Sequence, residues 1–296
     1  MLQQPSPAAT ISIVVPHYND LENLAICLDL LGRQVVDDAF EIVVADNNSS
    51  CDRVALVEIC DRPNTRLIDV VEQGAAPARN GGVEASRSPL LAFIDSDCRP
   101  EPGWLQAGIR ALSRSTLVGG RVDVTVDDED ALTPTEAFER IFAFNNARYI
   151  RDERFSVTAN MFTTRAVFDQ VGGFRSGVSE DREWGQRAAV LGYTWLYEPA
   201  ARMGHPARRT PDELHRKWRR LMRESFLLAR ERQGFPLTWL LRAWVVVLSL
   251  PLALLAARRS DQVRTLADRL NAMRVVVRLR FWRFVEAHRL VLAKTP

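Results

Sequence analysis

Short apolar runs alternate with longer helical patterns along the first hundred residues of the chain. The runs are rich in β-branched residues and apolar at nearly every position, and they cover 11–15, 41–45, 66–71 and 90–94. Helical patterns lie between them, over 21–33 and up to residue 61. Strands that are apolar on both faces are typical of parallel sheets covered by helices. The pattern therefore predicts an α/β domain built from βαβ units around a mostly parallel central sheet.

The alternation loosens after residue 100, and the chain becomes mainly helical after residue 210. We expect a helix over 101–114, an extended segment over 116–126, a helix from near Thr135, and a helix, turn and strand over 179–209. Beyond residue 211 the patterns are helical and basic, with a long segment over 261–292. We therefore predict two domains, an α/β domain over 1–207 and a basic, apolar helical tail over 208–296.

Charge is distributed unevenly between these two domains. Residues 1–207 carry 19 Lys and Arg against 30 Asp and Glu, a net charge of −11, whereas residues 208–296 carry 20 against 7, a net charge of +13. The basic tail therefore suits an anionic partner, either a membrane surface or nucleic acid. No nucleic-acid-binding motif occurs in the sequence, so we expect no nucleic-acid partner.

The stretch 236–257 is the most apolar part of the tail. Its length matches the roughly 20 residues that span a bilayer, but Arg242 and Pro251 interrupt it, and the run without a charged residue, 243–257, is 15 residues long. We therefore expect the tail to associate with an anionic membrane surface without crossing it. A single transmembrane span and a soluble helical cap are the alternatives. Because "MLQQPSPAAT" does not read as a signal peptide, we expect a cytoplasmic protein, peripheral on the inner face of the cell membrane.

Two aspartates close the fourth predicted strand, in the stretch "LLAFIDSDCRP". Residues i and i+2 of an extended segment point to the same side, so Asp95 and Asp97 can converge on one ligand. Converging carboxylates suit a hard divalent cation, Mg²⁺ or Mn²⁺, that also binds phosphate oxygens. From these residues alone, the alternative is that Asp95 caps the following turn and Asp97 is solvated.

Further polar motifs follow the predicted strands in a definite order. They are "VVPHYND", "VVADNNSS", "ARNGG", "FIDSD", "SEDREWGQRAAVLGY" and "GHP". This order, over about 11–205, resembles the family 2 glycosyltransferases, which have the nucleotide-sugar-binding GT-A fold. The resemblance implies a GT-A domain that takes a nucleoside-diphosphate sugar, followed here by a basic helical region.

The resemblance implies a donor site at the carboxyl ends of the strands. In such enzymes the turn after the first strand lines the nucleotide pocket, the aspartate after the second contacts the base or ribose, and the arginine of "ARNGG" lies near the phosphates. The alternatives are an ordinary turn, a helix N-cap for Asp46 and a salt bridge for Arg79. Residues 47–49 are better candidates for this cap than for ligand contacts. The implied nucleotide-sugar-binding residues are Pro16, Tyr18, Asn19, Asp46, Arg79, Asn80, Asp95 and Ser96.

The resemblance also implies the metal ligands and the catalytic base. Asp97 coordinates the metal directly, Asp95 assists, and His205 of "GHP" supplies a further ligand. Asp181 is the general base that takes a proton from the acceptor hydroxyl, and Glu180 assists it. For both acidic residues of "SEDREW" the alternative is a favourable charge at a helix N-terminus.

Three further residues are implied at the sugar and acceptor side of the site. Gly173 and Phe174 form the "GGF" turn, and Trp184 lies about one helical turn after Asp181. The indole of Trp184 offers an apolar face to a sugar ring or, alternatively, packs in the core. Arg187 is expected to pair with a nearby carboxylate or phosphate.

The implied reaction is a single displacement that inverts the anomeric carbon. One sugar moves from a UDP-sugar to a hydroxyl of a glycan or lipid-linked acceptor while a metal neutralises the leaving diphosphate. Because "LHRKWRR" lacks the QxxRW motif of processive synthases, we expect one sugar per acceptor. A nucleotidyltransferase and a non-catalytic membrane-associated relative are the alternatives. The first usually has a glycine-rich basic loop, which "PHYND" lacks, and the second predicts loss of the acidic clusters.

Overall fold

The computed structural model describes residues 9–293, which form two compact units. The first unit comprises the chain up to Asp123, Asn145–Ser176 and Glu180–His205, and the second comprises Val124–Phe144, Gly177–Ser179 and the chain from Pro206 onward. The predicted boundary at residue 207 lies beside the division at 205/206. Residues 124–144 differ from the prediction, because they belong to the second unit. Most of the N-terminal stretch used to predict the location lies outside the described residues.

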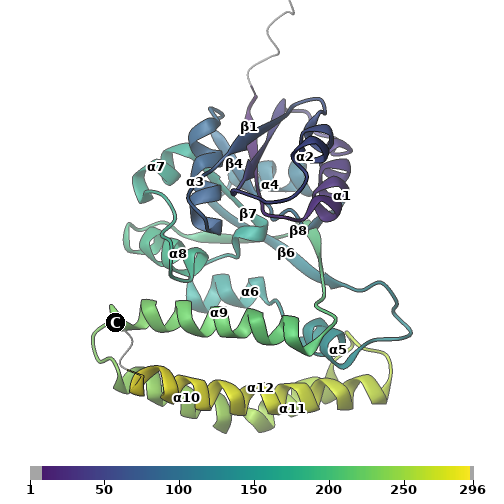
Figure 1. Cartoon of the computed structure of the whole chain (residues 1–296). Coiled ribbons are helices and arrows are strands. Elements are labelled where there is room, and N and C mark those ends of the chain that lie inside the picture. The colour runs from purple at the N-terminus through teal and green to yellow at the C-terminus, as the bar shows by residue number, and fades with distance from the viewer. Residues whose placement is uncertain (1–8, 294–296) are drawn as a thin grey trace, which may run out of the picture. The chain divides into compact units, whose positions relative to one another are not determined.

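The first unit is built around a mixed sheet, in the order β3-β2-β1-β4-β7-β6-β8-β5 (Figure 1). Parallel pairing joins β3, β2, β1 and β4, whereas β7 pairs antiparallel with β4 and β6, and β5 with β8. The α/β class is therefore confirmed, and the sheet is mixed because antiparallel pairs formed by β7 and β5 accompany the four parallel strands. The strands are β1 (Ile11–His17), β2 (Phe40–Asp46), β3 (Thr65–Asp69), β4 (Leu90–Phe93), β5 (Arg99–Pro100), β6 (Leu117–Thr125), β7 (Met161–Thr164) and β8 (Trp195–Pro206).

Successive residues of β1 enter two different cores, as the period of two in a strand requires. Ile11, Ile13 and Val15 belong to a core that includes residues of α1, α2 and α4, and Val14 belongs to a core that includes residues of α3, α7 and α8. Helices thus cover both faces of the sheet, which explains why its strands are apolar throughout. The helices of this unit are α1 (Leu21–Gly32), α2 (Arg53–Cys60), α3 (Ala75–Ala85), α4 (Trp104–Leu112), α6 (Asn146–Arg148), η1 (Tyr149–Glu153), η2 (Thr158–Asn160), α7 (Arg165–Val171) and α8 (Glu180–Val190).

Side-chain caps fix the starts of the helices that follow β1 and β2. The carboxylate of Asp20 accepts from the backbone N–H of Asn23, at 3.1 Å, and begins α1. Asp52 caps α2 by accepting from two backbone N–H groups. The prediction that a residue of 47–49 caps this helix is wrong. These residues lie in the loop between β2 and α2, where the Asn47 side chain donates to the carbonyl of Glu72 and the Ser49 hydroxyl donates to Asp46.

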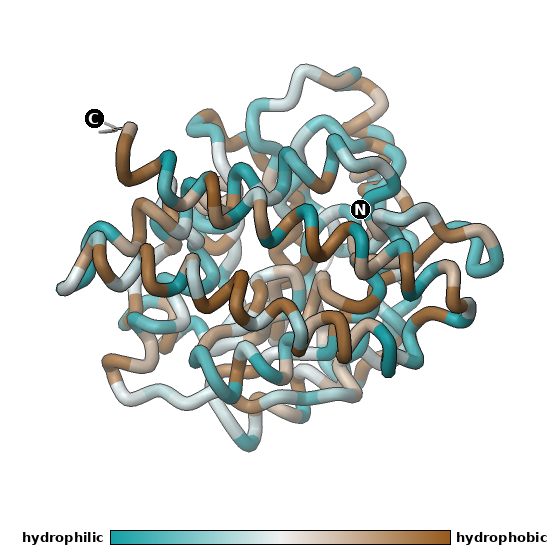
Figure 2. Tube along the Cα trace, turned by 90° about the horizontal axis from the view of Figure 1, so that it is seen from below, coloured by the Kyte–Doolittle hydropathy of each residue, from teal (hydrophilic) through white to brown (hydrophobic). Residues whose placement is uncertain are grey.

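The second unit is helical, and α12 packs against each of the other helices in it. Apolar and polar residues alternate along these helices (Figure 2). One of its buried carboxylates, Glu139, accepts from Lys217 Nζ at 2.9 Å and from the backbone N–H of Arg208 at 2.8 Å. The helices are α5 (Pro134–Phe142), α9 (Pro211–Arg230), α10 (Leu237–Leu248), α11 (Leu250–Arg259) and α12 (Leu266–Leu292).

The apolar stretch 236–257 forms two helices and not one. Helices α10 and α11 meet at Ser249 with a bend of 44°. Within residues 9–293, no helix by itself has the length and apolar content to cross a membrane, and this bent pair meets both criteria only when its two halves are taken together.

Candidate active site

Polar side chains follow three neighbouring parallel strands where those strands end. In the pairing of β1 with β2, His17 lies opposite Asp46, and the end of β4 beside β1 leads into Asp95 and Asp97. Because the carboxyl ends of parallel strands share one edge of the sheet, these groups form one polar region. This edge is where the sequence places the donor site.

Asp46 is the centre of a buried hydrogen-bond network. Its Oδ1 lies 2.8 Å from Nδ1 of His17 and accepts from the Ser49 hydroxyl at 2.6 Å, while its Oδ2 accepts from the backbone N–H of Ser49 at 3.3 Å. Asp46 and His17 are only 4% and 1% exposed. Burial alone would raise the pKa of Asp46, but the hydrogen bonds from Ser49 and His17 together outweigh it and lower the pKa. Asp46 is therefore held as a carboxylate with most of its surface covered.

The contacts of His17 define its tautomer. Nε2 accepts from the backbone N–H of Asp20, at 3.2 Å, so it carries no proton, and Nδ1 is left to donate to Asp46. The neutral imidazole thus links the start of α1 to the end of β2. Neither His17 nor Ser49 was among the predicted site residues. The signal for His17 is its position, since a strand-end histidine in "PHYND" faces the aspartate that ends the neighbouring strand.

The loops after β1 and β2 are also tied to each other. Asn19 has a left-handed φ of 56°, which asparagine tolerates, and its Oδ1 accepts from the backbone N–H of Ser50 at 2.7 Å. Its own backbone N–H donates to the Ser49 hydroxyl at 2.9 Å. Beside it, the ring of Tyr18 is 54% exposed. Tyr18 is therefore presented to solvent at the predicted nucleotide pocket, whereas Asn19 shapes the turn.

Arg79 joins two acidic segments, at Asp95 and Glu180, that are far apart in sequence. One guanidinium nitrogen donates to Oδ1 of Asp95 at 2.6 Å, and another pairs with the carboxylate of Glu180. The end of β4 and the start of α8 are thus held together by one side chain from α3. This bridge brings the predicted donor site and the predicted base segment into one place.

The position of Arg79 differs from the implied phosphate contact. The residue is 4% exposed, and its Nε is buried without a hydrogen-bond partner among the described residues. Burial would lower the pKa of the guanidinium, but the negative charges of Asp95 and Glu180 raise it above its usual range. We interpret Arg79 as the cation that holds the acidic groups in place, which is the salt-bridge alternative.

Asp97 and His205 lie close enough to share an ion. Their Oδ2 and Nε2 atoms are 3.6 Å apart. Neighbouring ligands in the octahedral shell of Mg²⁺ lie about 2.9 Å apart, so a small side-chain movement would place both on one cation. Asp95, the third predicted ligand, has one oxygen committed to Arg79. Across residues 9–293, no three His, Cys, Asp or Glu side chains are grouped as a complete metal site. Asp97 and His205 would therefore supply two of the six ligands of such a cation.

The acidic pair at the start of α8 has two different environments. Glu180 pairs with Arg79, whereas Asp181 Oδ1 accepts from the backbone N–H of Arg182 at 2.7 Å and the residue is partly exposed. The next side chain, Arg182, pairs with Glu153 of η1 at 2.9 Å. The N-terminal turn of α8 also favours negative charge. Glu180 is thus fixed by an ion pair with Arg79, whereas Asp181 keeps part of its surface exposed.

The "GGF" turn and the following helix pack differently from the prediction. Asn80 accepts from the backbone N–H of Phe174 at 2.8 Å and donates to its carbonyl at 2.9 Å, so it positions the turn. A Cβ on Gly173 would lie 3.0 Å from this amide. Phe174 and Trp184 are 4% and 0% exposed and belong to one aromatic cluster with Phe168.

Sugar stacking by Trp184 is therefore not supported, because both faces of its ring are covered and its N–H donates to the carbonyl of Gly172 at 2.8 Å. Phe174 is likewise a core residue. Arg187 pairs with Glu183 at 2.9 Å, a carboxylate on its own helix. Pro16, near the end of β1, and Ser96, in the turn after β4, are partly exposed.

Comparison with known proteins identifies relatives of this chain. The model of glycosyltransferase family 2 matches residues 12–172, which is more than half of the chain. The chain is 29% identical to the glycosyltransferase AglE of Haloferax volcanii, with 81% of each protein covered. It is 26% identical to the pre-mycofactocin glycosyltransferase of Mycobacterium tuberculosis, over 67% of this chain but only 43% of that relative.

Solved structures share the fold. The mannosyltransferase PcManGT of Pyrobaculum calidifontis, in complex with GDP-Man and Mn²⁺, superposes with a TM-score of 0.62 at 18% identity, covering 99% of this chain and 90% of that one. GalNAc-T7, with UDP, GalNAc and Mn²⁺, gives a TM-score of 0.55 at 17% identity, over 69% and 44% of the two chains. The GT-A fold is thus confirmed, together with a glycosyltransferase ancestry. The chain belongs to glycosyltransferase family 2 and is a glycosyltransferase.

Proposed function

We propose that the chain is an inverting, metal-dependent glycosyltransferase that moves one sugar from a UDP-sugar to a hydroxyl of a glycan or lipid-linked acceptor. The observation that carries the proposal is the Arg79 bridge from Asp95 to Glu180. It brings the acidic strand end, where a donor diphosphate would bind, next to the helix that holds Asp181. A transferase must hold the donor and the acceptor in contact, so the donor-binding region and the general base must lie close together.

The donor side is proposed to use the polar edge of the sheet. Pro16, Tyr18 and Asn19 line the nucleotide pocket, and Asp46 orders it through the buried network with His17. Asp97 and His205 would hold Mg²⁺ or Mn²⁺, with Asp95 beside them. The ion, when bound, supplies positive charge that neutralises the leaving diphosphate. The Mn²⁺ complexes of PcManGT and GalNAc-T7 support the use of a divalent cation.

Asp181 is proposed as the general base. The acceptor oxygen forms a bond to the anomeric carbon while the bond from that carbon to the diphosphate oxygen breaks, and the acceptor proton passes to the Asp181 carboxylate. Attack opposite the leaving group inverts the anomeric centre. Glu180 is a positioning residue in this scheme, because its ion pair with Arg79 fixes the first turn of α8.

The nucleotide of the donor has one specific alternative. GalNAc-T7 was solved with UDP, which agrees with the UDP-sugar proposed here, but PcManGT was solved with GDP-Man and matches a larger share of this chain. GDP-sugars are therefore the second candidate class. The family match removes the support for a nucleotidyltransferase.

We propose that the second unit places the enzyme on the cytoplasmic face of the cell membrane, where it would glycosylate a cell-envelope acceptor. The support is the net charge of +13 over 208–296 and the apolar residues that α10 and α11 expose. A single span formed by the bent pair of helices is the alternative.

A screen of nucleotide sugars tests the donor proposal without knowledge of the acceptor. Purified protein is incubated with UDP-sugars and GDP-sugars in Mn²⁺ or Mg²⁺, and release of nucleoside diphosphate is measured with and without EDTA. We expect slow hydrolysis of a UDP-sugar that stops in EDTA. Hydrolysis of GDP-sugars alone would replace UDP by GDP, and hydrolysis that is unaffected by EDTA would contradict the metal. Retention of anomeric configuration in a transferred product, read by NMR, would contradict the single displacement.

A further inference from the structure

Arg283 of the second unit is a partly buried cation without a hydrogen-bond acceptor. Its guanidinium lies over the ring of Trp218, 4.4 Å from the centroid, and its Nε is inaccessible to solvent. Among residues 9–293, no carboxylate or carbonyl accepts a hydrogen bond from it. A guanidinium has five N–H donors, and charged groups are rarely removed from water without a partner of opposite charge.

The surroundings of Arg283 make this cation unfavourable in the protein alone. Burial, followed by the positive charge of Arg280 one turn away on α12, lowers the pKa of Arg283 to about 10. The stacked indole offsets part of the cost, as a cation over an aromatic face is attracted to it. The remaining free-energy cost of burying this charge indicates that a negatively charged group binds beside Arg283 in the functioning protein.

The neighbouring polar groups are donors as well. The indole N–H of Trp218 is buried and has no acceptor among the described residues. Arg280 donates to the carbonyl of Val246 and the hydroxyl of Ser249, both at 2.8 Å, and so holds the bend between α10 and α11. A ligand that satisfies two guanidinium groups and an N–H must carry several acceptor oxygens and negative charge, which are the properties of a phosphate group.

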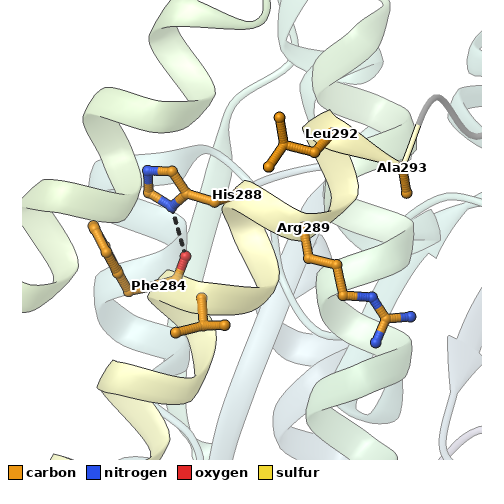
Figure 3. A pocket seen from close by; sticks show the side chains of 6 residues that line it. Phe284, His288, Arg289, Leu292 and Ala293 are labelled. Atoms are coloured by element: carbon orange, nitrogen blue, oxygen red, sulfur yellow. Dashed lines mark hydrogen bonds between the residues drawn. The ribbon is translucent and has the colours of Figure 1, made fainter.

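The helices that Arg280 holds expose apolar side chains on one face. Exposed apolar residues recur about once in each helical turn, whereas Trp239 and Ala243 of the same stretch are buried. On α12, an open apolar hollow of about 510 Å³ lies beside Phe284, His288 and Leu292, close to Arg283 in sequence (Figure 3). The second unit therefore combines this buried cation with exposed apolar surface, which fits an amphiphile as the ligand. The exposed residues are Leu237, Leu241, Trp244, Val245, Leu248, Leu252 and Leu255.

We propose that Arg283, with Arg280 and the indole N–H of Trp218, binds the phosphate group of an anionic lipid whose acyl chains lie along the exposed face of α10 and α11. This site rests on the membrane association proposed above and gives it a specific contact. General attraction of a basic surface to anionic lipid needs no such site, so the two can be separated by experiment.

The test compares two arginines of the same helix. Arg283→Met removes the guanidinium proposed to bind phosphate and keeps an apolar side chain over Trp218. Arg278→Met removes an exposed arginine of α12 and serves as the matched control. Full-length protein is sedimented with vesicles of phosphatidylcholine containing phosphatidylglycerol, and with phosphatidylcholine alone. We expect Arg283→Met to weaken binding to the anionic vesicles about tenfold or more, the loss typical of hydrogen bonds to a charged group. Arg278→Met is expected to weaken it about fivefold at most.

Thermal unfolding without lipid separates a binding role from a structural one. We expect Arg283→Met to unfold at the same or a higher temperature than the wild type, because it removes a buried charge that has no partner. Trp218→Phe, which keeps the ring and deletes only the N–H, should weaken anionic vesicle binding in the same direction. Lower thermal stability of Arg283→Met, or equal losses of vesicle binding in Arg283→Met and Arg278→Met, would overturn the site.

Inorganic phosphate distinguishes a soluble ligand from a lipid. If phosphate at millimolar concentration raises the unfolding temperature of the wild type but not of Arg283→Met, and vesicle binding is the same in both, the ligand is soluble and the lipid proposal is wrong. Failure of the wild type to bind anionic vesicles would reject both this site and the membrane association. Donor hydrolysis, measured in solution, judges the glycosyltransferase mechanism separately.

Discussion

Replacing Arg79 with leucine tests whether one buried cation holds the acidic parts of the active site together. The guanidinium is 4% exposed and pairs with Asp95 and Glu180, whose side chains are partly buried. Removing one partner of a buried ion pair costs about 3–5 kcal/mol, because the remaining charges are left uncompensated. Since both carboxylates retain some contact with water, we expect about 3 kcal/mol, a large fraction of the roughly 5–15 kcal/mol that stabilises a typical domain.

Arg202 provides a matched control within the same unit. It also pairs with two carboxylates, those of Glu101 and Asp123, but it is itself largely exposed. Surface ion pairs contribute about 0–1 kcal/mol, so Arg202→Leu should cost about 1 kcal/mol or less. The free energy of unfolding is measured by urea denaturation followed by circular dichroism. Our reasoning is refuted if Arg79→Leu costs no more than Arg202→Leu.

A double-mutant cycle with Glu180→Gln isolates the pair itself. We expect a coupling energy between positions 79 and 180 of about 1–3 kcal/mol, as for residues of one ion-pair network. Arg79→Leu should also abolish most sugar transfer, because the start of α8 is no longer held against the end of β4. A coupling energy near zero would mean that the bridge does not position α8.

Three further predictions follow from the described contacts. His17→Ala should raise the KM for the donor about tenfold with little change in kcat. His17→Asn should restore most of the donor affinity, because its amide can replace the Nδ1–H that donates to Asp46. Equal KM values in the two variants would contradict a role for this hydrogen bond. Trp184→Ala should cost about 3–5 kcal/mol of stability by opening a cavity, and a thermally stable variant with a raised KM would instead return this residue to the sugar site. Burial would raise the pKa of Glu139, but the positive charges of Lys217 and a neighbouring guanidinium lower it below its ordinary value of 4.5. The ionised carboxylate therefore stabilises the fold above pH 4.5, and this stabilisation is lost as the pH falls through the lower pKa of the folded state. Glu139→Gln should remove this contribution and flatten the acid side of a plot of unfolding free energy against pH.

The order of strands and helices in the first unit can be predicted from the sequence, because each element is indicated by the residues of its own segment. β-Branched apolar runs and the polar residues that end them predict β1, β2 and β4, and the parallel pairing then brings Asp46 and Asp95 to one edge. The Arg79 bridge could not be predicted in this way. It depends on the packing of α3 and α8 around β4, which no local pattern specifies.

The inward direction of Trp184 was also not predictable from α8 alone. The helix is polar over most of its length, so its sequence does not distinguish a core face from a ligand face. The same limit explains the assignment of 124–144 to the second unit. Helix α5 is amphipathic, and only its packing against α12 shows which core its apolar face enters.

The most direct test of the proposed mechanism compares Asp97→Asn with Asp181→Asn. Binding of the donor nucleoside diphosphate is measured by calorimetry with and without Mn²⁺, and sugar transfer is measured in parallel. Asp97→Asn should lose the Mn²⁺-dependent part of binding and lose transfer, whereas Asp181→Asn should bind like the wild type and lose transfer by about a hundredfold or more, the scale of general-base catalysis. Full transfer activity in Asp181→Asn, or unchanged Mn²⁺-dependent binding in Asp97→Asn, would contradict the account.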